Sequence, residues 1–341
     1  GKKFFEPALM GILNCMGSKS KRVQRSACGS LAELANCFQN RKFHRMSDYV
    51  QPIVSTFVKG LALYRLLNFN HLVDVISSVC RVWSLEDESK VVTNPKLMDA
   101  LIPPLLKRWI AFSESSTCMF PVMECLTRFT SFMGPIPHFQ QTYAPSMFQQ
   151  AFQLACRIKQ EKAEYVIKKE RKMMMNNNLF CQCCNNNNNN NNKIINNEKL
   201  KALQEQLGDI DDERVGQHVR MDVPNLEYWV SAMDMLSAIC ETTQPAFAKL
   251  AFGVPATENK LMEMLYCAIL EKHLAVRRNG LALLGDLILF CSDQVGPHIG
   301  KFMPLCIENL QPELYLICTN SSWCIGVGLE KYGIKMNIYF K

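Results

Sequence analysis

Apolar residues recur along this chain at helical spacing. In two segments, 23–34 and 276–287, a Val and two Leu residues stand at offsets 0, 8 and 11, with a small residue at offset 4. That spacing keeps the three apolar residues on one helical face, and the small residue lets a neighbouring helix approach closely. No run alternates apolar and polar residues between turn residues, as a strand would. The pattern therefore predicts an all-α protein.

A second recurring motif leads from apolar or aromatic residues through a proline into an amphipathic helix. Its prolines Pro7, Pro52, Pro104 and Pro145 are 45, 52 and 41 residues apart, and Pro304 repeats the motif. These intervals bracket the period of about 40–47 residues that HEAT and armadillo units have. Because proline lacks an N–H group, we expect each to stand in the first turn of its helix. The sequence predicts an α-α superhelix, a HEAT-repeat solenoid.

Each repeat is expected to pair an A helix, which carries the proline, with a B helix, which carries an acid such as Glu33 or Asp286 at the edge of its apolar face. We expect such pairs at about residues 3–38, 47–84, 96–134, 139–243, 258–294 and 299–333.

The repeats are expected to form two blocks around an insert. Residues 1–172 should hold about three and a half helix pairs and residues 223–341 about two and a half, truncated at the C-terminus. Residues 173–222 contain a run of Asn, a poor helix former without apolar surface, so this insert and linker should be largely disordered. The uncapped stretch Asn337–Lys341 and the opening Gly1 suggest that both ends are cut from a longer protein.

The net charge of +7 does not indicate a nucleic-acid groove. Much of the basic excess lies in residues 159–172 and 193–201, beside and within the Asn-rich region. A nucleic-acid groove would interleave basic residues with exposed aromatic residues along one face. The sequence has no such stripe, so we expect no direct contact with nucleic acid.

The cysteines indicate a reducing compartment, the cytosol or the nucleus. They stand singly in apolar helical segments, where a free thiol behaves as a small hydrophobe. Examples are Cys28, Cys80, Cys125, Cys156, Cys240 and Cys267. No signal peptide opens the sequence, and no apolar run is long enough to span a bilayer, so we expect no membrane insertion.

The sequence offers no catalytic centre. It has no glycine-rich phosphate loop, and no His has the i, i+4 partner that would place two metal ligands on one helical face. Cys181, Cys183 and Cys184 resemble half of a zinc site whose other half is missing. We expect no enzymatic activity, no cofactor and no metal.

The remaining candidate for a functional feature is a binding surface. In a solenoid the B helices line a concave face, and their exposed residues form a long groove. Acids on these helices would favour a basic, extended ligand, although such acids can also be ordinary solvated residues. Trp323 follows a polar run, so it is either a core aromatic residue or a partly exposed anchor for a ligand.

An ordered series of motifs resembles the transportin (karyopherin-β2) family of nuclear import receptors. The motifs are Val23-Gln24 with Ala27-Cys28; Leu101–Trp109; Phe120-Pro121 with Glu124-Cys125-Leu126; Leu283–Leu287; and Asn320 with Trp323 and Ile325-Gly326. The resemblance covers nearly the whole chain outside the insert and the irregular segment after it. It implies the central to C-terminal HEAT repeats of such a receptor.

The resemblance also implies partners and site residues. Members of the family bind cargo proteins through basic, extended proline-tyrosine nuclear localisation signals, bind the Ran GTPase mainly through an N-terminal half that this chain lacks, contact nucleoporins, and shuttle between cytoplasm and nucleus. The implied cargo-binding residues are Trp323, Asn320, Asp286, Glu241, Asp234, Asp74, Ser78, Glu33 and Asn36.

The chain departs from the family pattern at Ser26, Glu33, Asn36 and Arg278. Arg278 puts a cation into a groove that should receive cations. A second hypothesis stays open: a HEAT scaffold subunit, of the phosphatase or coat-complex type, that joins folded partners.

Overall fold

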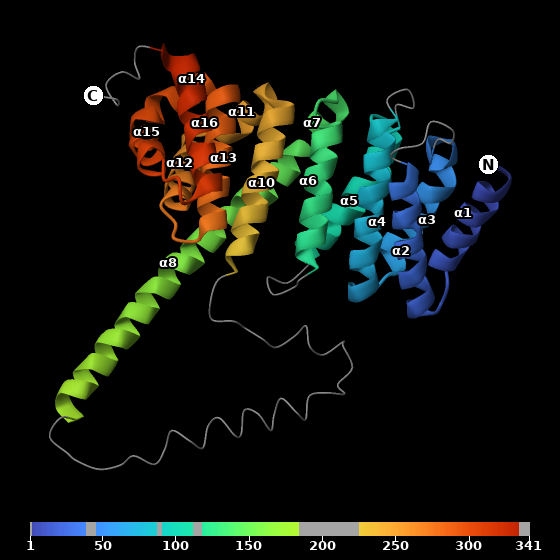
Figure 1. Cartoon of the computed structure of the whole chain (residues 1–341), viewed down its shortest axis with the longest axis horizontal. Helices are drawn as coiled ribbons and strands as arrows, with labels where there is room; N and C mark the ends of the chain where they lie inside the picture. Colours follow the sequence, from blue (N-terminus) through green and yellow to red (C-terminus); the bar gives the residue numbers. More distant parts are fainter. Residues whose placement is uncertain (1, 39–45, 87–90, 112–117, 184–224, 334–341) are drawn as a thin grey trace. The chain divides into compact units, whose positions relative to one another are not determined.

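A computed structural model describes residues 2–38, 46–86, 91–111, 118–183 and 225–333. Every regular element in these ranges is a helix, and none of the described residues belongs to a strand. Successive helices pair along the chain (Figure 1). The predicted fold class, an all-α solenoid of helix pairs, is confirmed.

The helices fall into the two predicted kinds. The A helices are α1 (Lys2–Met16), α3 (Val50–Leu63), α5 (Pro95–Ala111), α8 (Ala144–Cys183), α12 (Pro255–Ile269) and α15 (Ile299–Glu308). The B helices are α2 (Lys21–Phe38), α4 (Leu66–Leu85), α6 (Met119–Met133), α10 (Leu226–Thr243), α13 (Leu274–Phe290) and α16 (Tyr315–Tyr332). Short connecting helices are η1 (Met46–Tyr49), α7 (Pro137–Thr142), α11 (Pro245–Phe252), α14 (Ser292–Val295) and η3 (Gly296–His298).

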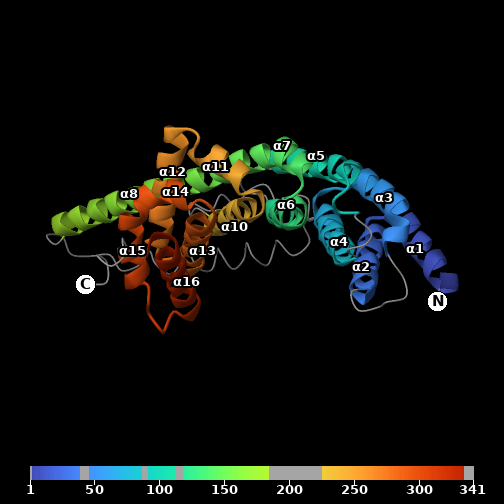
Figure 2. The ribbon, with the colours of Figure 1, turned by 90° about the horizontal axis from the view of Figure 1, so that it is seen from above.

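The B helices pack on one another in chain order, and we call them the B row. Helix α2 packs on α4, α4 on α6, α6 on α10, α10 on α13, and α13 on α16. Figure 2 separates α2, α4 and α6 from the A helices α1, α3 and α5. The B row is therefore one continuous surface of neighbouring helices.

The contact between α6 and α10 closes the B row across the long insertion. Phe120 and Tyr228, near the starts of the two helices, stack with ring centroids 4.2 Å apart. At the other ends, a Cβ atom on Gly134 would come within 2.0 Å of the Thr242 hydroxyl oxygen. The two helices thus run in the same direction and touch at both ends, as neighbouring B helices of successive repeats should.

Two compact units make up the chain. One consists of residues 1–112, 118–159 and 225–341, and the other of Ser113–Thr117 with Gln160–Pro224. In the second unit, α8 continues to Cys183, although the sequence predicts a loop from Met173. Met is a good helix former, and extending an existing helix needs no new nucleus. The rest of the insert lies outside the described residues, so its predicted disorder and the predicted domain boundaries stay predictions.

The prediction that each motif proline stands in a first turn is wrong for part of the series. Pro52 and Pro145 lie in first turns, but Pro7, Pro104 and Pro304 lie inside α1, α5 and α15. These three are exposed or half-buried. Water can therefore reach the carbonyl group that loses its hydrogen bond, which lowers the cost of an interior proline.

The apolar face predicted for the B helices is confirmed in α13 and only partly in α2. Val276, Leu284 and Leu287 are fully buried, and a Cβ atom on Gly280 would come within 3.0 Å of Ala268 on α12. In α2, Leu31 is buried but Val23 is 38% exposed. Val23 lines an open groove between α1 and α2, which explains its exposure.

The packing predicts a large loss of stability for a core truncation in the B row. Phe129 of α6 is fully buried. Phe129→Ala should lower the free energy of unfolding by about 3–5 kcal/mol, measured by urea unfolding. Phe4→Ala is the matched control because Phe4 is 77% exposed. Equal effects of the two substitutions would contradict the described core.

Candidate functional site

Every residue of the predicted binding site lies on the B row. Glu33 and Asn36 belong to α2, Asp74 and Ser78 to α4, Asp234 and Glu241 to α10, Asp286 to α13, and Asn320 and Trp323 to α16. Because α10, α13 and α16 are consecutive, the structure brings the residues on these three helices together. Asp74 and Ser78 lie beside α6 instead, while Glu33 and Asn36 lie on the exposed side of α2. We call Asp234, Glu241 and Asp286 the C-terminal acidic cluster.

Asp286 is a half-buried carboxylate between two B helices. Ser237 of α10 donates a hydrogen bond from its hydroxyl group to the Asp286 carboxylate. Desolvation raises the pKa of Asp286 to about 6, and the charge of Glu241 adds to the rise, while the Ser237 hydrogen bond opposes it. A cation brought to this carboxylate would replace lost solvation and favour the ionised form.

Asp234 has a similar environment one helix away. Asn279 of α13 donates from Nδ2 to Asp234 Oδ1 at 2.5 Å. Desolvation raises the pKa of Asp234 to about 6, and the positive charge of Arg278 opposes this rise. The residue as a whole remains exposed, so solvent and ligand can still reach the crowded carboxylate. Asp234 and the half-buried Asp286 thus offer two partly desolvated negative charges on one surface.

Trp323 is the exposed tryptophan of the chain. It is 37% exposed, whereas Trp83, Trp109 and Trp229 are almost completely buried. The indole lies against α13 at Gly285, where an added Cβ atom would come within 2.1 Å of Trp323 Cζ3. Gly285 therefore provides the space for the ring, directly beside Asp286 in the chain. A large aromatic surface next to a carboxylate suits an aliphatic stem with a cationic end.

Asn320 has a structural contact that the sequence did not reveal. Its Nδ2 atom donates to the carbonyl oxygen of Arg278 at 2.9 Å, which holds α16 on α13. One N–H of the Asn320 amide is thus used between the two helices.

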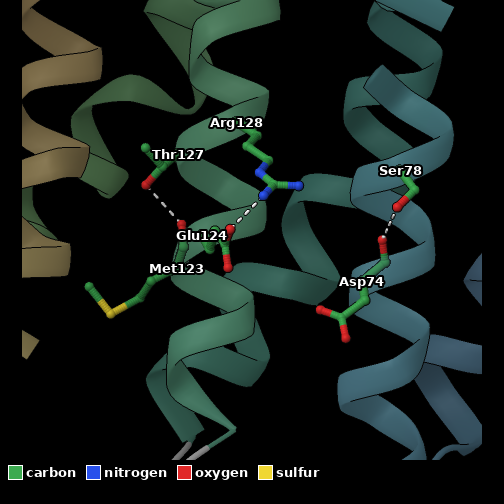
Figure 3. A network of polar contacts seen from close by, with 6 residues as sticks. All are labelled: Asp74, Ser78, Met123, Glu124, Thr127 and Arg128. Atoms are coloured by element: carbon green, nitrogen blue, oxygen red, sulfur yellow. Dashed lines mark hydrogen bonds and ion pairs between the residues drawn. The ribbon is translucent and has the colours of Figure 1, made fainter. Parts of the chain in front are cut away.

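A second polar cluster lies between α4 and α6 (Figure 3). Ser78 donates its hydroxyl hydrogen to the backbone carbonyl of Asp74 at 3.0 Å. Arg128 and Glu124 of α6 form an ion pair at 2.5 Å. Desolvation raises the pKa of Asp74, and the charges of His71 and Arg128 oppose the rise. Sequence reasoning missed Glu124 and Arg128 as site residues, although their i, i+4 spacing signals a shared helix face.

The described residues contain neither a group of metal ligands nor a membrane-spanning helix. No group of three or more His, Cys, Asp or Glu residues there could hold a metal ion. The cysteines 181–184 lie outside the residues whose side chains the structure describes. No described helix is both long and apolar enough to cross a membrane.

The paired helices and the polar B row define the chain as a HEAT-repeat solenoid with a candidate ligand surface. Its fold is similar to that of importin β, with a TM-score of 0.57 at 13% identity over 97% of this chain and 33% of that chain. No family model matches the chain.

The chain is also similar in sequence to several curated relatives. The chain is 22% identical to human transportin-1 over 336 residues, 98% of this chain and 30% of the relative. It is 24% identical to Dictyostelium discoideum transportin and 20% identical to importin subunit beta-2 of Schizosaccharomyces pombe, over 96% and 100% of this chain and 28% and 30% of the relatives. The chain thus spans about a third of their length. Along nearly its whole length the chain is thus similar in sequence to transportins and importin subunits of the karyopherin-β family, and none of these relatives is named as an enzyme.

The contact between Gly285 and Trp323 predicts a specific response to a small substitution. Gly285→Ala should push the indole outward, because the new methyl group takes its space. Iodide quenching of tryptophan fluorescence should then increase, since the other tryptophans are buried. Gly326→Ala, on the helix of Trp323, is the matched control because a Cβ there meets nothing within 4 Å. Unchanged quenching in Gly285→Ala would contradict the described position of the ring.

Proposed function

We propose that this segment belongs to a nuclear import receptor and binds an extended, basic segment of its cargo along the B row. The observation that supports this most directly is the pair of partly desolvated carboxylates, Asp234 of α10 and Asp286 of α13, with the exposed Trp323 packed on α13 at Gly285. Such a surface favours a cationic chain over a neutral or acidic one.

The energetics suit a disordered ligand. A hydrogen bond between an Arg side chain and a desolvated carboxylate contributes about 1.5–3 kcal/mol. A disordered segment loses conformational entropy when it binds, so its affinity depends on a small number of strong contacts. Trp323 and the C-terminal acidic cluster are the contacts we propose for this role.

The names of the relatives support the transport role in the proposal. Transportin and importin are names of transport proteins, and these relatives are about three times as long as this chain. We include in the proposal that the ligands are proline-tyrosine localisation signals, and that Asp74, Ser78, Glu33 and Asn36 contact them. Ran, nucleoporins and shuttling between cytoplasm and nucleus belong to the proposal for the whole receptor.

The direct test is a titration with a fluorescent basic proline-tyrosine peptide. Trp323→Ala should weaken binding of the peptide about tenfold or more, because tryptophan residues are frequent among the hot spots of binding sites. Tyr315→Ala is the matched control: Tyr315 lies on the same helix and is 73% exposed. Added salt should weaken binding to the wild-type chain.

An unchanged dissociation constant for Trp323→Ala would remove this residue from the site. Capture of folded subunits, with no binding of the basic peptide, would favour the scaffold hypothesis instead.

A further inference from the structure

Two arginines of the B row lie among the acids that a basic ligand would contact. Arg128 comes from α6 and Arg278 from α13. Both are held by hydrogen bonds to neighbouring side chains on their own helices. Each therefore keeps a positive charge close to acids of the candidate site.

Arg128 already pairs with a carboxylate. Its Nη2 atom lies 2.5 Å from Glu124 Oε1, one helical turn earlier. Figure 3 shows Arg128 above Glu124 on α6, while Asp74 of α4 points toward α6. The charge of Arg128 also stabilises the ionised form of Asp74. The side chains of Arg128 and Glu124 are 43% and 62% exposed, so their pair contributes little to folding and can exchange partners.

Arg278 acts on the C-terminal acidic cluster through its charge, without an ion pair. Its Nε atom donates to Asn279 Oδ1 at 3.1 Å, and Asn279 in turn donates to Asp234. This arrangement keeps the guanidinium group near Asp234, whose ionised form it stabilises. Arg278 is only half-buried, so it can move aside when another cation arrives.

We propose that Arg128 and Arg278 are specificity-determining residues that compete with the basic ligand for the carboxylates of the B row. This inference rests on the proposed function. A ligand with one Arg or Lys replaces Arg128 at Glu124, or is opposed by the charge of Arg278 at Asp234, and gains little. A ligand with several basic residues can contact both clusters. Its second contact forms within the same complex, so its affinity rises more than that of a ligand with one basic residue. The internal arginines thus discriminate against weakly basic segments.

The test compares two fluorescent peptides on the full chain. One carries several Arg and Lys residues, and the matched peptide carries Gln at those positions. Arg128→Gln and Arg278→Gln should each tighten binding of the basic peptide about threefold to tenfold, because each removes a positive charge near a carboxylate. Binding of the Gln peptide should not change. Arg128→Lys and Arg278→Lys keep the charge and serve as controls that bind like the wild-type chain.

If the wild-type chain binds the basic peptide, single and double Gln variants that bind it equally or more weakly would overturn the inference, because the arginines would then have only a structural role. If the wild-type chain prefers the basic peptide and the Gln variants bind no tighter, the proposed function stands and this inference falls. If only the double Gln variant binds the basic peptide, competition is supported, and the two arginines prevent binding of this peptide to the wild-type chain. If no variant binds it, both proposals fail.

Discussion

The direct packing of each B helix on the next is the constraint on which the rest of the structure depends. Three asparagines repeat one contact along it: Asn68, Asn279 and Asn320 each donate to a backbone carbonyl of the preceding B helix, those of Lys21, Val230 and Arg278. These bonds satisfy polar groups at a close helix–helix contact and fix the register of neighbouring helices. Together with the contacts of α6 and α10 across the insertion, they make one surface from segments far apart in sequence.

The same close packing produces the electrostatics of the candidate site. Asp234 and Asp286 lose solvent because they stand at seams between B helices, and each receives one hydrogen bond from the neighbouring helix. The energy lost on desolvation is partly recoverable when a cation binds. Trp323 depends on this packing too, since its indole rests where Gly285 leaves space on α13. Fold and candidate function therefore have one physical origin.

Much of the fold could be predicted because it is encoded locally. Helical spacing of apolar residues and the recurrence of proline predict the pairs of helices, and acids such as Asp234 and Asp286 stand on the B helices as expected. The positions of the prolines within their helices were harder to predict. Pro104 is tolerated inside α5 because its side of the helix is partly exposed to solvent, and this depends on the tertiary packing. The continuation of α8 past Met173 was missed because an Asn-rich composition suggests a loop, whereas helix propagation favours continuation.

The details of the site could be predicted less well because they depend on contacts between helices. The spacing of Glu124 and Arg128 was visible, but not the position of Arg128 beside Asp74 on another helix. Gly285 lies in the Leu283–Leu287 motif, but its contact with Trp323 could not be predicted from the sequence. The contact depends on how α13 and α16 are aligned with each other. The same holds for Asn320, whose amide nitrogen bonds to α13.

The most direct measurement is the affinity for a basic, histidine-free peptide between pH 5 and pH 7.5, which bracket the pKa of about 6 for Asp234 and Asp286. At pH 7.5 both carboxylates are ionised, and lowering the pH through 6 protonates them and removes the charge that binds the cation. Affinity should therefore fall as the pH falls in the wild-type chain, and it should be weaker and nearly constant in the variant with Asp234→Asn and Asp286→Asn. An affinity of the wild-type chain that does not change over this range would contradict the account.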